Sequence, residues 1–131
     1  MARLTQEQLL EIFDALKKEV QPYEKGTIKA RIDIQGKYDL WSEKPGLVAH
    51  GKLRHEVSFT TLIIQSNYVG FYYMPIYTNC EAITAQLAPE LLNMLKGKAC
   101  FHIKAIDKEL LMAVKTAMKV GYAQYKANGW L

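Results

Sequence analysis

Residues 65–77 read QSNYVGFYYMPIY, and this stretch decides the fold that the sequence predicts. Its centre, residues 68–74, alternates as a β-strand does, yet large apolar or aromatic side chains fall on both of its sides. An antiparallel strand with one face in water shows polar residues on that face. We therefore predict a central strand with two covered faces, one packed against helices and the other against a group that the pattern does not identify.

The preceding segment, residues 57–65, predicts the other half of an antiparallel hairpin, because Ser66 and Asn67 supply a short polar turn. Gly70, among aromatic neighbours, indicates either a bulge or the close approach of another group. Strict alternation places five large side chains on the side of this hairpin that the helices would leave bare: Leu62, Ile64, Tyr68, Tyr72 and Met74.

Amphipathic helices are predicted near both ends of the sequence. A capping box formed by Thr5 and Gln8 begins the first helix, and Pro22 ends it. Asp107 caps the second helix, which is predicted to run to about Ala127. Each helix carries one apolar stripe, so both must be buried against another layer.

Further strands are predicted on either side of the central hairpin. Residues 27–34 alternate cleanly, and a turn leads from them into a second strand at 37–43. Residues 47–56 show no clear period and predict a connection, whereas residues 99–104 predict a last short strand. The inward side of the first of these strands is predicted to hold Ile28, Ala30, Ile32 and Ile34.

These patterns predict one α+β domain over residues 1–131. It is a two-layer sandwich in which an antiparallel sheet of about five strands carries the N- and C-terminal helices on one face. Half of the residues are hydrophobic and 23% are charged, which is typical of a globular protein. No apolar run approaches the roughly 20 residues of a membrane span, and no signal peptide is evident. A cytoplasmic protein without membrane contact is expected.

Charge and motifs limit the function further. The net charge is +4, but Lys and Arg alternate with Asp and Glu and form no basic run, which argues against nucleic acid as a partner. The motifs of common hydrolases, NTPases, dehydrogenases and metalloproteases are absent. The sequence thus favours a non-enzymatic binding protein.

The bare side of the central hairpin is the first candidate site. Three coverings stay open: residues 44–56 folding back, a second subunit in a homodimer, or an apolar ligand oriented by tyrosine hydroxyls. The residues predicted to form this ligand or interface surface are Trp41, Tyr68, Tyr72, Met74 and Tyr77.

A cysteine and a histidine on the last strand form a second candidate. Cys100 and His102 share one side of this strand because their spacing is two, and Cys80 or His50 could supply a third metal ligand. The alternative is that both cysteines are free thiols that pack as small apolar groups. His50 and His55 are otherwise expected to be exposed in the connection.

Three stretches, YVGFYYMPIY, LLNMLKGKACFHIK and GYAQYKANGW, resemble the YdhG-like domain-of-unknown-function family, whose members look like the frataxin fold. The resemblance covers roughly the part of the chain from Phe59 onward. It implies a small intracellular iron-binding chaperone that carries iron and delivers it to a partner protein. Frataxins hold iron weakly on exposed carboxylates, and the matching positions on the first helix are Glu7, Glu11 and Asp14.

The spacing of these carboxylates has two interpretations. Side chains three and four positions apart on a helix lie within about 6 Å, so their oxygens can meet one hard cation. The outer face of any amphipathic helix is also charged, and Lys18 follows on the same ridge. The sequence does not decide between an iron site and an ordinary solvated helix face.

Overall fold

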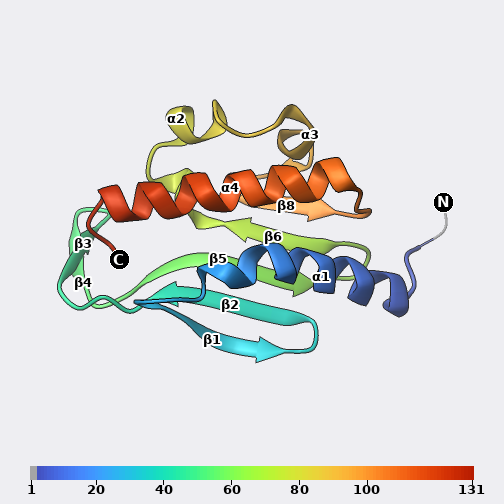
Figure 1. Ribbon diagram of the computed structural model, residues 1–131, viewed down its shortest axis with the longest axis horizontal. Helices are drawn as coiled ribbons and strands as arrows, with labels where there is room; N and C mark the ends of the chain where they lie inside the picture. Colours follow the sequence, from blue (N-terminus) through green and yellow to red (C-terminus); the bar gives the residue numbers. More distant parts are fainter. Residues whose placement is uncertain (1–2) are drawn as a thin grey trace.

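A six-stranded antiparallel sheet forms the centre of the computed structural model, which describes residues 3–131 (Figure 1). Its strands follow the order β1-β2-β5-β6-β8-β7. The bounds are β1 (Ile28–Ile34), β2 (Lys37–Ser42), β5 (Val57–Ile64), β6 (Val69–Tyr73), β8 (Cys100–Ile103) and β7 (Leu95–Lys96). The sheet has one strand more than the sequence predicted, because the two residues of β7 extend its edge.

Two long helices, α1 (Gln6–Val20) and α4 (Lys108–Ala127), lie next to each other across one face of the sheet (Figure 1). The predicted α+β two-layer sandwich is thus confirmed. Both predicted caps are present, since Thr5 and Gln8 form the capping box and the Asp107 carboxylate accepts the Leu110 N–H at 2.7 Å. These caps satisfy backbone N–H groups that have no partner within the helix.

Short elements complete the chain. They are η1 (Gln21–Tyr23), η2 (Met74–Tyr77), α2 (Cys80–Thr84) and α3 (Pro89–Leu92). Figure 1 shows α2 and α3 beyond α4, on the side away from α1. None of the helices in residues 3–131 is both long enough and apolar enough to span a lipid bilayer.

The core lies between the sheet and the two long helices. The fully buried strand residues there include Tyr38, Leu40, Phe59, Leu62, Phe71 and Tyr73. The Tyr73 hydroxyl donates to the Ala117 carbonyl of α4, so this buried polar atom is satisfied. The helix-facing side of the central strand is therefore the packed core that the sequence predicted.

A β-bulge in β1 changes which side chains face the core. Ala30 pairs with Leu40, but Ile32 pairs with Asp39, so Arg31 is an extra residue in this strand. Beyond the bulge the alternation is reversed, and Ile34 is 61% exposed. The prediction that Ile32 and Ile34 lie on the inward side with Ile28 was therefore wrong, because strict alternation does not allow for a bulge.

A second bulge lies in β5. Leu40 pairs with Thr60 and Trp41 pairs with Ser58, which leaves Phe59 as the extra residue. Consequently Phe59 and Thr60, although adjacent in sequence, are both fully buried. The phase shift also turns Leu62 and Ile64 towards the core, so their predicted place on the bare side was wrong.

The second face of the sheet, which we call the outer face, is consequently more polar than the alternation implied. One row of paired residues crosses all six strands, and its members are Ile32, Asp39, Thr61, Tyr72, Cys100 and Lys96. Thr61 donates to the Asp39 carboxylate at 2.7 Å within this row. Tyr72, Thr61 and Ile63 are half-buried rather than sealed.

Residues 47–56, predicted as a connection, contain a separate hairpin of β3 (Leu47–Ala49) and β4 (Lys52–Arg54). Within β3, Leu47 and Ala49 are buried, whereas Val48 between them is 61% exposed. In Figure 1 the hairpin stands at the end of the sheet where α4 ends. It therefore builds a wall at one end of the sheet.

Candidate functional site

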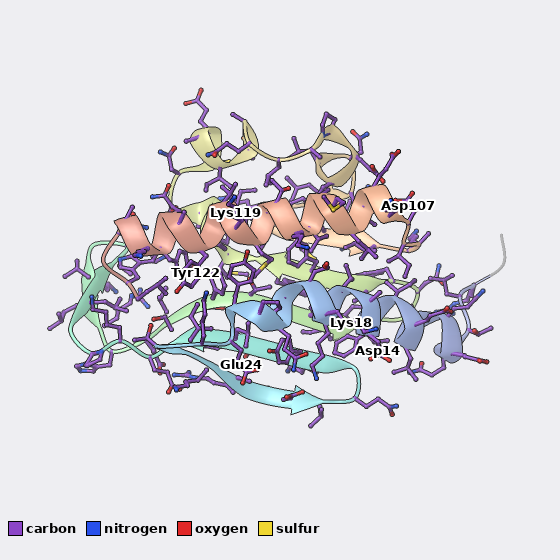
Figure 2. All side chains as sticks on the ribbon, in the orientation of Figure 1. Asp14, Lys18, Glu24, Asp107, Lys119 and Tyr122 are labelled. Carbon is purple, nitrogen blue, oxygen red and sulfur yellow. The ribbon has the colours of Figure 1, made fainter. Side chains whose placement is uncertain are left out.

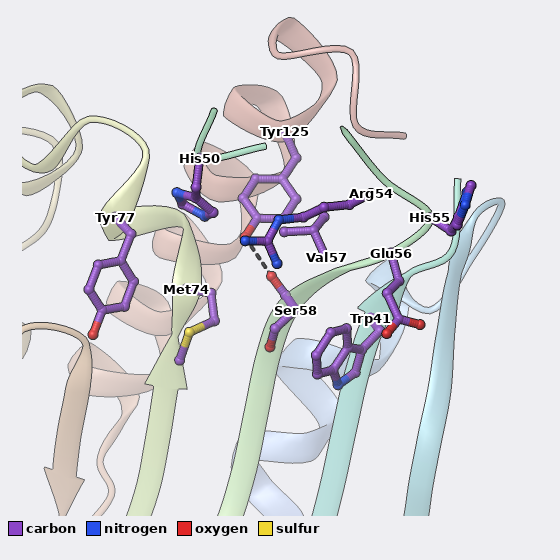
Figure 3. A pocket seen from close by; sticks show the side chains of 10 residues that line it. All are labelled: Trp41, His50, Arg54, His55, Glu56, Val57, Ser58, Met74, Tyr77 and Tyr125. Carbon is purple, nitrogen blue, oxygen red and sulfur yellow. Dashed lines mark hydrogen bonds between the residues drawn. The ribbon is translucent and has the colours of Figure 1, made fainter. Parts of the chain in front are cut away.

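A hollow of about 560 Å³ lies between the β3–β4 hairpin and the adjoining end of the outer face (Figure 3). We call this end of the outer face the near end, and the opposite end the far end. The sheet, the hairpin, η2 and α4 all contribute to the hollow. Its ten lining residues are Trp41, His50, Arg54, His55, Glu56, Val57, Ser58, Met74, Tyr77 and Tyr125. Aromatic, imidazole, guanidinium and hydroxyl groups thus converge on one space.

The floor of the hollow is closely packed. Tyr125 of α4 is almost fully buried, packs against Phe59 and Trp130, and donates its hydroxyl to the Ser58 carbonyl at 2.6 Å. Burial raises the pKa of this hydroxyl above that of an ordinary tyrosine, so it stays protonated and keeps its donor role. The floor therefore connects the last long helix to the bulged end of β5.

The hairpin wall is held by Trp130. Its indole N–H donates to the Val48 carbonyl at 2.8 Å, and its ring lies 5.7 Å from that of His50, centroid to centroid. His50 adopts a left-handed backbone with φ of 52°, followed by Gly51 at 76°. These positive φ values close a two-residue turn. The turn and the indole contact together place the His50 ring at the hollow.

The aromatic wall is formed by β2 and η2. The Trp41 indole N–H donates to Asp39 at 2.9 Å, and the Arg31 guanidinium lies 4.3 Å from the centroid of the indole ring. Both contacts fix the orientation of the ring. On the opposite side, Met74 is half-buried and Tyr77 is 50% exposed. One wall is therefore fixed and the other is freer to adjust.

One carboxylate lines the hollow and is already bound. Glu56 accepts a hydrogen bond from Arg31, which also pairs with Glu43. The hydrogen bond from Arg31 lowers the pKa of Glu56 below its ordinary value. Glu56 is thus ionised and directed to Arg31.

The far end of the outer face is arranged differently. The Tyr68 and His102 rings stack with centroids 3.8 Å apart, and the Gln65 amide donates to the Tyr72 hydroxyl at 3.3 Å. The Tyr72 ring also lies on Gly70, where an added Cβ would sit 2.8 Å from the ring carbon Cε2. The close approach predicted at Gly70 is therefore confirmed, and the approaching group is Tyr72.

The five residues predicted to form a ligand or interface surface are divided between these two ends. Trp41, Met74 and Tyr77 line the hollow. Tyr68 and Tyr72 lie at the far end and cover the sheet themselves. The structure thus brings three of the five together.

Cys100 lies on the same strand as His102, whose ring forms the stack with Tyr68. Burial raises the pKa of the Cys100 thiol, and partial burial together with Lys96 and Lys104 lowers the pKa of His102. Both Cys80 and Cys100 are free cysteines, as the free-thiol interpretation expected, but Cys80 is exposed, so the expectation that it packs as a small apolar group was wrong. Cys100 is therefore less readily ionised than an ordinary thiol.

The carboxylates proposed for iron lie on the exposed side of α1. Glu7, Glu11 and Asp14 are all exposed, and Asp14 and Lys18 both project from this helix (Figure 2). Within residues 3–131, no three His, Cys, Asp or Glu side chains are grouped so that they could hold a metal ion. Iron binding at these positions stays a prediction from the resemblance.

Several lining residues were not predicted as site residues. Arg54, Glu56 and Ser58 come from the hairpin segment and from the start of β5, and Tyr125 was expected only as an inward residue of the last helix. A local signal did exist for the hairpin, because His50 and Gly51 form a dipeptide suited to a tight turn. Their assembly around Trp41 depends on contacts far apart in sequence.

A larger groove of about 690 Å³ runs between α4 and the segment before α3. No aromatic side chain lines it, and its exposed large apolar side chain is Met112, at 55% exposure. The hollow beside Trp41 combines more kinds of binding group in a smaller space. We therefore take it as the candidate functional site.

Comparison of the chain with protein-family models, with curated proteins and with solved structures gave no match. The resemblance to the YdhG-like family is therefore left as a prediction from the sequence.

Proposed function

We propose that the protein is a non-enzymatic cytoplasmic binding protein that holds a small ligand with a flat apolar body in the hollow beside Trp41. The hollow carries the proposal, because its volume of about 560 Å³ falls within the roughly 300–1,000 Å³ of small-molecule sites. Its apolar and aromatic lining supplies contact area, while a few polar groups supply orientation.

The fixed and adjustable walls suit such a ligand. Trp41 is held by Asp39 and Arg31, so a flat molecule meets a ring that has little conformational freedom to lose. Met74 can adapt its unbranched side chain to the shape of the ligand. Tyr77 is half-exposed and can close over the opening.

A small molecule fits this surface better than a second subunit does. Stable protein interfaces cover about 800 Å² on each partner and need a continuous patch. The aromatic residues of the outer face are instead interrupted, since Tyr68 and Tyr72 are occupied with His102 and Gly70. The apolar lining of the hollow is concave and local.

A titration with 2-naphthamide, a flat neutral probe, followed by amide NMR shifts tests the proposal. Shifts are expected at the lining residues, with Trp41→Ala weakening the affinity about tenfold through loss of an aromatic contact worth about 1.5 kcal/mol. Tyr68→Ala is the matched control, since it removes an aromatic ring from the far end of the same face. Shifts that avoid the hollow, or equal losses in the two variants, would contradict the proposal.

A further inference from the structure

Arg54 brings a positive charge to the hollow that no carboxylate within residues 3–131 neutralises. The salt bridges of that part of the chain join Lys17 to Asp33 and Arg31 to Glu43 and Glu56, and Arg54 takes part in none of them. Its Nε donates to the Ala49 carbonyl at 3.2 Å. This bond holds the base of the guanidinium against the hairpin and leaves both terminal amino groups free to bind another acceptor.

The one carboxylate among the lining residues is already engaged. Glu56 lines the same space, but its carboxylate is bound by Arg31 and lies on the Trp41 side in Figure 3. Arg31 is in turn shared with Glu43. Among the lining residues, all of which lie within residues 3–131, Arg54 is therefore a guanidinium that forms no salt bridge.

The groups around Arg54 can themselves donate hydrogen bonds to a bound anion. In Figure 3 its side chain runs from β4 towards the middle of the lining residues, with His50 and Ser58 around it. The Ser58 hydroxyl and an imidazole N–H can each donate a hydrogen bond. Arg54 and His50 are both exposed, so an anion from solvent can reach these groups.

We propose that the ligand is an organic acid, with a flat apolar body placed against Trp41 and one carboxylate bound by Arg54. This inference rests on the proposed function and names the chemical class of its ligand. The planar guanidinium matches the planar carboxylate and can bind both oxygens. Among the lining residues that the structure describes, Arg54 is the one Lys or Arg side chain, and its charge beside ionised Glu56 favours one negative charge on the ligand over the two of a phosphate monoester.

A matched pair of probes tests the charge separately from the shape. The pair is 2-naphthoate and 2-naphthamide, which differ chiefly in charge, titrated into the full chain and followed by amide NMR shifts. For the unaltered protein we expect 2-naphthoate to bind about tenfold more tightly. Arg54→Gln should remove that advantage without changing the affinity for 2-naphthamide, and Arg54→Lys should keep part of it.

Lys52→Gln is the control, because it removes the same charge from the same strand at a residue that does not line the hollow. Its probe affinities should match those of the unaltered protein. Equal binding of acid and amide, equal effects of the two glutamine variants, or tighter binding of 2-naphthyl phosphate than of 2-naphthoate would overturn the assignment to a carboxylate. Failure of both probes to shift the lining residues would instead count against the proposed function.

Discussion

The two ends of the outer sheet face carry similar side chains and differ in what those side chains contact. At the far end, Tyr68 stacks on His102 and Tyr72 lies on Gly70, so the rings cover the sheet. At the near end, Trp41 and Tyr77 stand around a hollow. The comparison teaches that the aromatic residues of this sheet face line a hollow where a neighbouring element stands beside the sheet, and cover the sheet where none does. Here that element is the β3–β4 hairpin.

The largest expected effect comes from the floor of the hollow. Tyr125→Ala removes a buried ring and its hydrogen bond to Ser58, so we expect the free energy of unfolding to fall by about 3–5 kcal/mol. Urea unfolding followed by circular dichroism measures this change. Tyr122→Ala, in the same helix but only half-buried, should cost clearly less. Equal losses would show that the floor is not specially packed.

A smaller effect is expected at the self-covered end. In Gly70→Val the added Cβ would meet the Tyr72 ring, so we expect the ring to be lifted and the free energy of unfolding to fall by about 1–3 kcal/mol. Adding Tyr72→Ala should reduce that loss, because the obstructing ring is then gone. Binding of 2-naphthamide should remain unchanged. A variant as stable as the parent would break the comparison.

The smallest effect concerns pH. The pKa of His102 is lowered by desolvation and by Lys96 and Lys104, so the folded state binds a proton less readily than the unfolded state. The stability linked to His102 is therefore complete above the ordinary pKa of about 6.5 and is lost as the pH falls through the folded value. NMR titration of the imidazole should give a midpoint below 6.5, which Lys104→Gln should raise. A midpoint at or above 6.5 would contradict this account.

Features that depend on local sequence were predictable. The capping box at Thr5 and the cap at Asp107 involve atoms a few residues apart, and both are present. The hairpin of residues 57–74 followed from a polar turn between two apolar strands. Trp41, Met74 and Tyr77 were also predicted from the sequence as surface contact residues, because large aromatic or flexible apolar residues outside a core stripe are candidates for that role.

The bulges were not predictable from a period of two. One extra residue, Arg31 or Phe59, costs little locally, and its position is decided by which side chains then fill the core across neighbouring strands. The site was predictable only in part for a similar reason. Arg54 lines the same hollow as Trp41 and Tyr125 because β4 pairs with β3 and because Trp130 holds the hairpin in place. No local sequence pattern indicates such contacts.

The bond from Trp130 to Val48 also sets an order of events during synthesis. The two residues are separated by 82 positions, so a nascent chain can form the strands around Trp41 well before the support for the hairpin has been translated. Until residue 130 leaves the ribosome, the near end of the sheet lacks this bond to its wall. The hollow should therefore be completed later than the strands that carry Trp41 and its neighbours.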